Sequence, residues 1–338
     1  MITLYCNQMR LKLSDFDYEL PSELIAQTPA KPRNHARLLV YDRVNQKIID
    51  DVFYNLDKYL PADSTLVFNN SKVEKCRLDF GSTEIFVLEE LGQRTFKALV
   101  RPGKKLRRDS QLSLPLPAGE LLVDTLSVDK DGVRTLRFNM SVNDPRLARF
   151  RRTPFPPYIK PDESLSGRYQ TVYASQSGSK ASPTAGLHFT QPQITKLAKD
   201  HQIVQLTLHV GLGTFAPVKN QDVTKHNMHA EKFSLSTTAA ATLNRAKHIT
   251  AVGTTTARTL ESLKRPFKES VGSTDIFITP GYKFKNTNAL VTNFHLPKST
   301  LLMLVAALVG TDELHRIYNH AIKSRYRFYS FGDVMLIL

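Results

Sequence analysis

Residues 249–263 read ITAVGTTTARTLESL, and this stretch decides the fold class. Its first four residues form a short apolar run that is typical of a buried strand. Gly253 interrupts the run, and the threonines after it open a segment through Leu263 that predicts a helix. A strand that leads directly into a helix is the building unit of α/β domains, in which the sheet is largely parallel.

The same alternation of strand and helix recurs on both sides of this unit. Ser236 is a predicted helix cap, as is Ser299 or Thr300, and Gly310 is a predicted helix end. Residues 1–60 are too poor in apolar segments to build a core of their own, so we expect them to join the same domain. Further strands are predicted at Arg37–Tyr41, His201–Val210, Ile276–Thr279 and Leu290–Thr292, and a further helix near Ser22–Gln27.

The middle of the chain has a different pattern. From residue 65 to residue 140, short runs alternate between apolar and polar positions without helical periodicity, and Asp131-Gly132 between two of them is a hairpin signal. We therefore predict a small all-β, barrel-like domain over residues 63–150. It would be inserted into a mostly parallel-sheet α/β domain formed by residues 1–62 and 151–338.

The composition is basic and poor in cysteine. The 338 residues include 46 Lys and Arg against 31 Asp and Glu, a formal charge of +15 that favours contact with a polyanion such as nucleic acid. Two cysteines cannot build a disulfide framework or a four-thiolate metal site, which favours a cytoplasmic protein. The longest apolar run, residues 301–309, is about half of the roughly 20 residues that span a bilayer, so we expect no membrane segment.

Two segments concentrate positive charge. Residues 101–108 read RPGKKLRR, and residues 146–160 (LARFRRTPFPPYIKP) interleave arginines with aromatic rings. Cations that bind phosphates and rings that stack on bases suit RNA, although a proline-stiffened linker with a solvated basic face would look the same. The candidate phosphate contacts are Lys104, Lys105, Arg107, Arg108, Arg151 and Arg152.

Polar residues follow several predicted strands, where ligands gather in open α/β sheets. Glycine and threonine are also ordinary turn and capping residues, so each junction alone is a weak signal. The junction residues are Gly211, Gly213 and Thr214, then Thr254, Thr255 and Arg258, and finally Asn293 and His295.

Two familiar cofactor patterns are imitated but not met. Gly211, Gly213 and Ala216 have the spacing of a dinucleotide fingerprint, yet Pro217 follows at once and no helix opening is present, so no nicotinamide or flavin is expected. His226 and His229 lack a clear third metal ligand, and no metal is expected. His229 with the nearby Glu231 instead suits proton transfer, the alternative being a solvated loop histidine.

Ordered blocks of sequence run along the chain from Ser14 onwards. They include SDFDYELP (14–21), LVFNNSKV (66–73), RYQTVYA (168–174), SPTAGLHFT (182–190), LHVGLGTF (208–215), HNMHAE (226–231), VGTTTARTLES (252–262), TNFHLPKSTLLMLV (292–305) and YRFYSFGDVMLI (326–337). Together these blocks resemble one family, the S-adenosylmethionine:tRNA ribosyltransferase-isomerases of queuosine biosynthesis. Residues 1–8 would be an extension before the usual family start.

The resemblance implies that S-adenosylmethionine is a co-substrate and that no metal takes part. Its ribosyl portion would be transferred to 7-aminomethyl-7-deazaguanine at the wobble position of tRNA and isomerised, giving epoxyqueuosine, adenine and methionine. The sulfonium acidifies the adjacent 5′ carbon, so a positioned base can remove a proton there. The alternative is a non-catalytic or altered-specificity tRNA-binding relative.

The resemblance does not by itself assign the base, so the roles of the candidate residues are our own expectation. His229 with Glu231 is the expected acid/base pair, and His188 and His209 are the alternates. Asn293 and His295 would read adenine or the deazaguanine edge, and the six basic residues would contact the anticodon arm of tRNAs with GUN anticodons. A monomer is expected. The residues expected to hold S-adenosylmethionine are Thr184, Gly186, Gly211, Gly213, Thr214, Thr254, Thr255 and Arg258.

Overall fold

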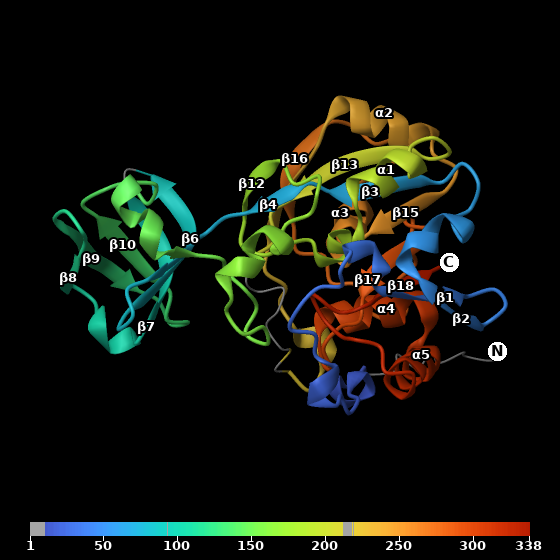
Figure 1. Cartoon of the computed structure of the whole chain (residues 1–338), viewed down its shortest axis with the longest axis horizontal. Coiled ribbons are helices and arrows are strands. Elements are labelled where there is room, and N and C mark those ends of the chain that lie inside the picture. The colour runs from blue at the N-terminus through green and yellow to red at the C-terminus, as the bar shows by residue number, and fades with distance from the viewer. Residues whose placement is uncertain (1–10, 93, 212–217, 219) are drawn as a thin grey trace, which may run out of the picture. The chain divides into compact units, whose positions relative to one another are not determined.

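A computed structural model describes residues 11–92, 94–211, 218 and 220–338. These residues form two compact units (Figure 1). Unit 1 comprises the described residues up to Lys72, Arg168–Gln176 and Ser182–Leu338. Unit 2 comprises Val73–Gly167 and Ser177–Ala181.

Unit 1 is built on a nine-stranded sheet of order β16-β14-β13-β3-β15-β17-β18-β1-β2. Its centre, β13-β3-β15-β17, is parallel, and β18 is parallel to β1. The other four pairs of neighbouring strands are antiparallel, so the sheet is mixed and the fold is mixed α/β. The prediction of a mostly parallel sheet therefore holds for the centre of the sheet but not for the sheet as a whole. The strands are β1 (Arg37–Asp42), β2 (Lys47–Val52), β3 (Thr65–Asn69), β13 (Gln202–Leu208), β14 (Glu231–Leu235), β15 (Ile249–Val252), β16 (Ser270–Thr274), β17 (Ala289–Asn293) and β18 (Val334–Ile337).

Strand β3 lies in the large sheet, although its sequence was assigned to the β insertion. It pairs in parallel with β13 and β15 in the middle of unit 1. Every residue of β3 is buried, as expected for a parallel strand with both faces covered. Its continuous burial, rather than an alternating pattern, distinguishes it from the strands of the insertion.

The α-helices of the described residues are α1 (Gln191–Leu197), α2 (Thr237–Arg245), α3 (Thr254–Ser262), α4 (Thr300–Val309) and α5 (Thr311–Lys323). The predicted caps are confirmed, because the Ser236 side chain accepts from the Ala239 amide and the Ser299 side chain from the Leu302 amide. Gly310 ends α4 with a φ of 87°, a left-handed conformation that glycine adopts without strain.

Both faces of the central sheet are buried. Phe68, Val252 and Val291 pack on one face with Phe189 and other apolar side chains. Residues that alternate with them, such as Leu290, face the other way and are also buried. The strand ends are therefore held rigidly by core packing on both sides.

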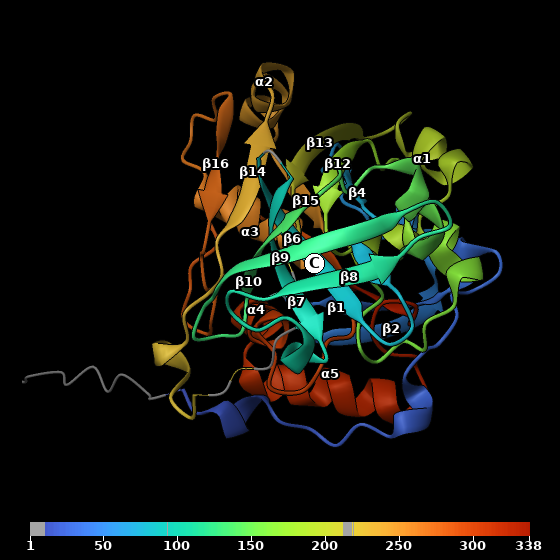
Figure 2. The ribbon, with the colours of Figure 1, turned by 90° about the vertical axis from the view of Figure 1, so that its left-hand side faces the viewer.

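Unit 2 contains a seven-stranded antiparallel sheet of order β11-β5-β6-β7-β10-β9-β8. Asp131-Gly132 joins β9 to β10, as predicted, and Figure 2 shows the long pairing of β8 with β9. The sheet is a curled half-barrel with edges at β8 and β11 rather than a closed barrel. The strands are β5 (Arg77–Asp79), β6 (Glu84–Gly92), β7 (Thr95–Arg101), β8 (Gln111–Pro115), β9 (Glu120–Val128), β10 (Arg134–Phe138) and β11 (Arg151–Arg152). Two further short strands, β4 (Ser71–Val73) and β12 (Gln176–Ser179), form a separate two-stranded sheet.

Two local predictions are wrong. Residues Ile276–Thr279 form no strand, and the strand of this region is β16, a few residues earlier. The segment buries the Ile278 side chain without ladder pairing. The helix expected near Ser22–Gln27 is only the 3₁₀ turn Ser22–Leu24. Within the described ranges, no helix combines the length and apolar character that crossing a membrane requires.

Candidate functional site

A pocket whose lining includes hydroxyl, amide and imidazole side chains lies at the carboxyl edge of the parallel strands in unit 1. Strands β15 and β17 are parallel neighbours, so the residues that follow them meet at one edge of the sheet (Figure 1). This is where open α/β sheets bind ligands. The pocket is lined by Ser182, Pro183, Thr184, Ala185, Val210, Gly253, Thr254, Thr255, Thr292, Asn293, His295 and Leu301.

Asn293 and His188 form a buried hydrogen-bonded pair beside the pocket. The Asn293 amide nitrogen lies 2.9 Å from His188 Nε2 and 3.1 Å from the Tyr329 carbonyl oxygen. Burial lowers the pKa of His188 to about 3, with Arg327 and Arg33 adding to the effect. A buried histidine with so low a pKa is a weak base near neutral pH.

His295 is held at the pocket wall by three contacts. Its Nε2 lies 2.8 Å from Thr292 Oγ1, its amide donates to the Tyr318 hydroxyl at 3.0 Å, and its carbonyl accepts from the Tyr18 hydroxyl. Burial lowers the pKa of His295 to about 3, so its imidazole is neutral near pH 7.

Glu231 and Arg258 form a buried ion pair next to the pocket, with side chains 4% and 3% exposed. One Glu231 oxygen accepts from Arg258 and the other from the Gly211 amide at 3.0 Å. Arg258 Nε donates to the Ile276 carbonyl at 3.2 Å, and its Nη2 has no hydrogen-bond partner among the described residues. The pair therefore ties the end of β13 to α3.

The structure gives His229 and Glu231 different surroundings, since His229 is exposed and Glu231 is buried against Arg258. Because β14 is antiparallel to β13, the chain just before β14 lies at the same edge of the sheet as the pocket. His229 is therefore on the pocket's side of unit 1. His209 is half-buried at the end of β13, and its amide donates to the Lys232 carbonyl at 2.9 Å.

Several predicted residues do gather in the pocket: Thr184, Thr254, Thr255, Asn293 and His295. Gly213 and Thr214 lie outside the described residues, as do Ala216 and residues 1–8. Ser182, Gly253 and Thr292 also line the pocket, although they were not among the predicted site residues. Their position inside the blocks SPTAGLHFT, VGTTTARTLES and TNFHLPKSTLLMLV was the signal that could have found them.

Gly186 has a packing role. A Cβ at this position would overlap the hydroxyl oxygen of Tyr173 and come within 2.9 Å of Thr171 Cγ2. This close approach explains the glycine without any contact to a ligand.

We expect Gly186→Ala to lower the free energy of unfolding by about 1–3 kcal/mol, because the added methyl group overpacks a closed site. Gly167→Ala is the control, since a Cβ at Gly167 meets no atom within 4 Å. Urea denaturation followed by circular dichroism measures both variants. Equal stability of Gly186→Ala and the parent would contradict the packing role.

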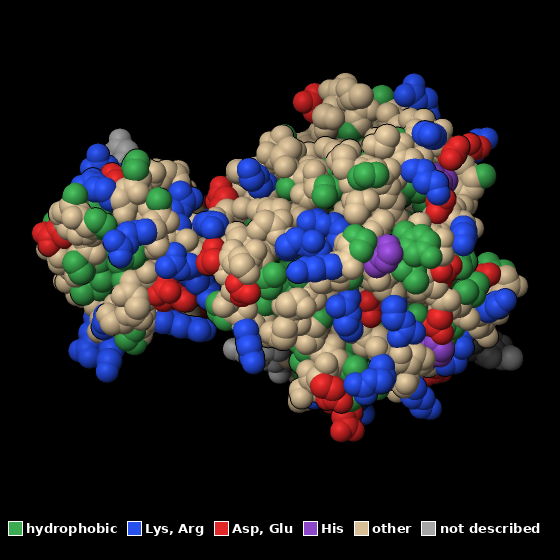
Figure 3. Space-filling view, in the orientation of Figure 1, with side chains coloured by type: hydrophobic (Ala, Val, Ile, Leu, Met, Phe, Trp, Pro, Cys, Tyr) green, Lys and Arg blue, Asp and Glu red, His purple; other side chains and the backbone are tan. Residues whose placement is uncertain are grey.

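The six residues predicted to contact phosphates lie in unit 2. Some of their side chains are hydrogen-bonded to neighbouring residues, and others are exposed to solvent. Lys105 Nζ donates to the Ser82 carbonyl at 2.8 Å and to Thr83 Oγ1 at 3.0 Å, so it anchors its own loop. Arg152 donates to the Arg149 carbonyl at 2.6 Å. Lys104, Arg107 and Arg108 are exposed, and Figure 3 shows Lys and Arg side chains spread over the surface of the unit.

Arg134 fixes the basic loop. Its guanidinium donates to the carbonyl oxygens of Leu106, Gly132 and Gly103 at 2.7, 2.6 and 2.9 Å. The loop is therefore a shaped surface that presents the exposed Lys104, Arg107 and Arg108 side chains in a defined arrangement.

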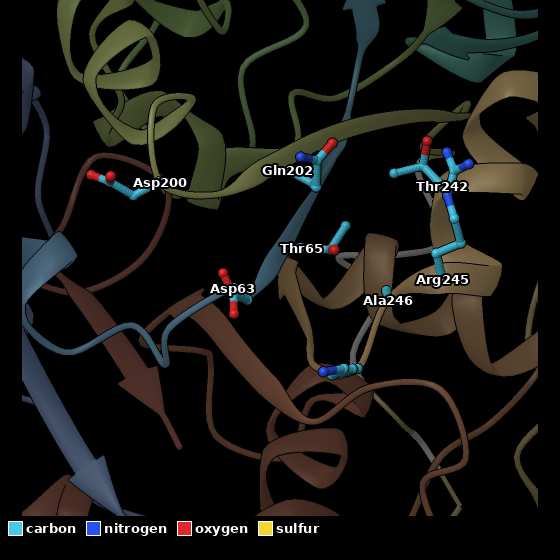
Figure 4. Close-up of a pocket in the computed structure, with 8 residues that line it drawn as sticks. Asp63, Thr65, Asp200, Gln202, Thr242, Arg245 and Ala246 are labelled. Carbon is cyan, nitrogen blue, oxygen red and sulfur yellow. The ribbon is translucent and has the colours of Figure 1, made fainter.

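A second, larger hollow of about 450 Å³ lies at the opposite edge of the sheet in unit 1. Figure 4 shows Thr65 and Gln202, the first residues of β3 and β13, between Asp200 on one side and Arg245 on the other. Most of its lining residues are exposed. Two of them, Asp63 and Asp200, are acidic, and two, Arg245 and Lys247, are basic. Among the described residues, no group of three or more His, Cys, Asp or Glu side chains could hold a metal ion.

Comparison with known proteins gives matches along almost the whole chain. A family model described as "Queuosine biosynthesis protein" matches residues 13–337. A protein of Thermotoga maritima is 47% identical over 340 residues, and one of Clostridioides difficile is 43% identical over 342 residues. Both are named S-adenosylmethionine:tRNA ribosyltransferase-isomerase, and each alignment covers 97% of this chain and 100% of the relative.

A solved structure agrees with these matches. The crystal structure of an S-adenosylmethionine tRNA ribosyltransferase from Thermotoga maritima aligns with a TM-score of 0.56 and 39% sequence identity. The alignment covers 96% of this chain and 100% of the other.

Proposed function

Since this chain belongs to the queuosine biosynthesis protein family, that of the S-adenosylmethionine:tRNA ribosyltransferase-isomerases, we propose that it transfers and isomerises the ribosyl portion of S-adenosylmethionine. The acceptor is 7-aminomethyl-7-deazaguanine at the wobble position of tRNA, and the products are epoxyqueuosine-tRNA, adenine and methionine. The observation that carries the proposal is the match to enzymes of this name over their entire length.

We propose that S-adenosylmethionine binds in the pocket at the carboxyl edge of unit 1. Thr184, Thr254 and Thr255 supply hydroxyl groups there, and Asn293 and His295 supply an amide and a neutral imidazole. The sulfonium makes the protons of the adjacent 5′ carbon acidic, and a base removes one of them. The electron pair left on C5′ forms a double bond to C4′ as the C4′–O4′ bond breaks, and the ring oxygen becomes the C1′ carbonyl oxygen as adenine leaves and takes up a proton. The tRNA amine adds to C4′ and loses a proton, and the C5′ carbanion attacks the C1′ carbonyl to close the cyclopentane. The resulting alkoxide displaces methionine from C5′ and forms the epoxide.

For the base we propose His229, with His209 as the alternate. Imidazole accepts protons at neutral pH, and His229 is exposed at the same edge of the sheet as the pocket. His188 is a poorer candidate because its pKa is depressed by burial. Glu231 acts through Arg258 and the Gly211 amide rather than as a proton carrier.

The decisive experiment incubates the protein with S-adenosylmethionine and tRNA that carries the deazaguanine precursor. Adenine and the epoxide nucleoside are expected by liquid chromatography and mass spectrometry. Binding of this tRNA without any adenine release would favour a non-catalytic relative. We place the reaction in the cytoplasm, with tRNAs of GUN anticodon as substrates and a monomer as the active form.

We expect Lys104, Arg107 and Arg108 of the basic loop, which are exposed, to contribute phosphate contacts. Neutralising Lys104, Arg107 and Arg108 to glutamine should reduce the slope of log K against log salt for tRNA binding by about 2–3, because each contact contributes about 0.7–0.9. The control variant neutralises Lys199, Arg245 and Lys247 of unit 1, which are also exposed. Both variants remove three positive charges. An equal change of slope in both variants would exclude specific contacts by the loop.

A further inference from the structure

The orientation of the Asn293 amide in the pocket is fixed. A carbonyl oxygen can only accept, so the Asn293 nitrogen must face the Tyr329 carbonyl, 3.1 Å away. The second N–H of the same nitrogen points to His188 Nε2 at 2.9 Å, which must therefore accept. Both donors of the amide are used, and its oxygen, Oδ1, is buried without a hydrogen-bond partner among the described residues.

Two hydroxyl groups share this property. Ser182 Oγ and Thr255 Oγ1 are buried with no partner in the described part of the chain, and both residues line the same pocket as Asn293. The three side chains are 2–6% exposed. Buried polar atoms are usually hydrogen-bonded, so three unpaired oxygens on residues that line one pocket indicate a site for a ligand.

The N-terminus of α3 opens into the same pocket through Thr254 and Thr255. Its N-cap is Gly253, which has no side chain to accept from the first-turn amides. Uncapped amides and the helix dipole favour a negative charge at this position. The pocket therefore combines a place for an anion with an acceptor that needs a donor.

We propose that this pocket is a subsite for an α-amino acid group, and that it binds the methionyl end of S-adenosylmethionine. The carboxylate lies at the α3 N-terminus and accepts from the Thr255 and Ser182 hydroxyls, and the ammonium donates to Asn293 Oδ1. A phosphate group would meet the Asn293 oxygen as a repulsive neighbour, and an adenine ring would bring no negative charge to the helix. This subsite rests on the proposed function and specifies how its co-substrate is held.

The same geometry makes His188 a positioning residue. Its Nε2 accepts from Asn293, and it thereby fixes the orientation of the amide and leaves Oδ1 without a hydrogen-bond partner among the described residues. His188→Gln retains a side-chain acceptor, whereas His188→Leu removes it. The first variant should preserve recognition of the ammonium group and the second should lose it.

The test measures both binding and turnover. Calorimetry compares L-methionine, L-methionine methyl ester, which lacks the free carboxylate, and 3-(methylthio)propionate, which lacks the amine. Adenine release compares S-adenosylmethionine with its decarboxylated form. We expect each incomplete methionine compound to bind about tenfold or more weakly than L-methionine, the usual effect of losing a hydrogen bond to a charged group. We expect decarboxylated S-adenosylmethionine to release adenine more slowly by a similar factor. Thr255→Val should reduce the ratio of the affinities for L-methionine and its methyl ester. His188→Leu should reduce the ratio of the affinities for L-methionine and 3-(methylthio)propionate.

Ratios between ligands are measured on one protein sample, so partial misfolding of a variant does not move them. Equal affinity for all three methionine compounds, no L-methionine binding at 10 mM, or preferences unchanged by Thr255→Val and His188→Leu would overturn the subsite. Absence of adenine release by the parent protein would instead overturn the proposed function, while the calorimetry would still decide whether the amino acid site exists.

Discussion

Replacing Glu231 with alanine is expected to lower the free energy of unfolding of unit 1 by about 3–5 kcal/mol, because it leaves the buried Arg258 guanidinium without its counter-charge. Glu231 is 4% exposed and also accepts from the Gly211 amide. The loss should appear in urea denaturation followed by circular dichroism.

Two further variants make this result specific to the buried pair. The double variant Glu231→Leu with Arg258→Met should recover most of the stability, since both charges are then absent. Asp17→Ala breaks an exposed ion pair, because the Asp17 and Lys298 side chains are 46% and 45% exposed. This variant should lose no more than about 1 kcal/mol of the free energy of unfolding. A loss below about 1 kcal/mol for Glu231→Ala would show that the pair carries little of the fold's stability.

His229→Ala is expected to reduce the rate of adenine release by about 10²–10⁴-fold, the usual contribution of a positioned general base. Release is measured with saturating S-adenosylmethionine and precursor-bearing tRNA, so that the chemical step rather than binding is compared.

His226→Ala is the matched control. His226 comes from the same segment but is half-buried. Its ring packs edge-on against the Phe277 ring, with the two ring centroids 5.4 Å apart. It should retain activity within a few-fold of the parent. If His229→Ala behaves like the control, His229 leaves the proton-transfer step and His209 becomes the next residue to test.

The local fold was largely predictable where the sequence signal is local. Strand β15 and helix α3 follow from the apolar run, Gly253 and the helix formers after it. The Asp131-Gly132 hairpin follows from its turn residues. Strand β16 was missed because its sequence, SVGST, is polar and forms an edge of the sheet, while the apolar residues at 276–279 imitate a strand.

Contacts across long sequence separations were not predictable. His188 and Asn293 are 105 positions apart, and nothing in either segment indicates that one amide joins them. Glu231 was paired in prediction with His229, two residues away, but its carboxylate binds Arg258, 27 positions along the chain. The meeting of Thr254, Asn293 and His295 in one pocket was nevertheless predictable. Residues that follow neighbouring parallel strands lie at the same edge of the sheet, which is where such sheets bind ligands.

The place of β18 in the sheet has a consequence for biosynthesis. This strand joins the β1–β2 hairpin to β17, and the Arg37 amide donates to Asp333, 296 positions later. The sheet of unit 1 cannot close until these late residues have left the ribosome, so it has a high contact order and is expected to fold slowly. Strands β5 to β11 of unit 2 are consecutive in the sequence and can pair while the rest of the chain is still being made.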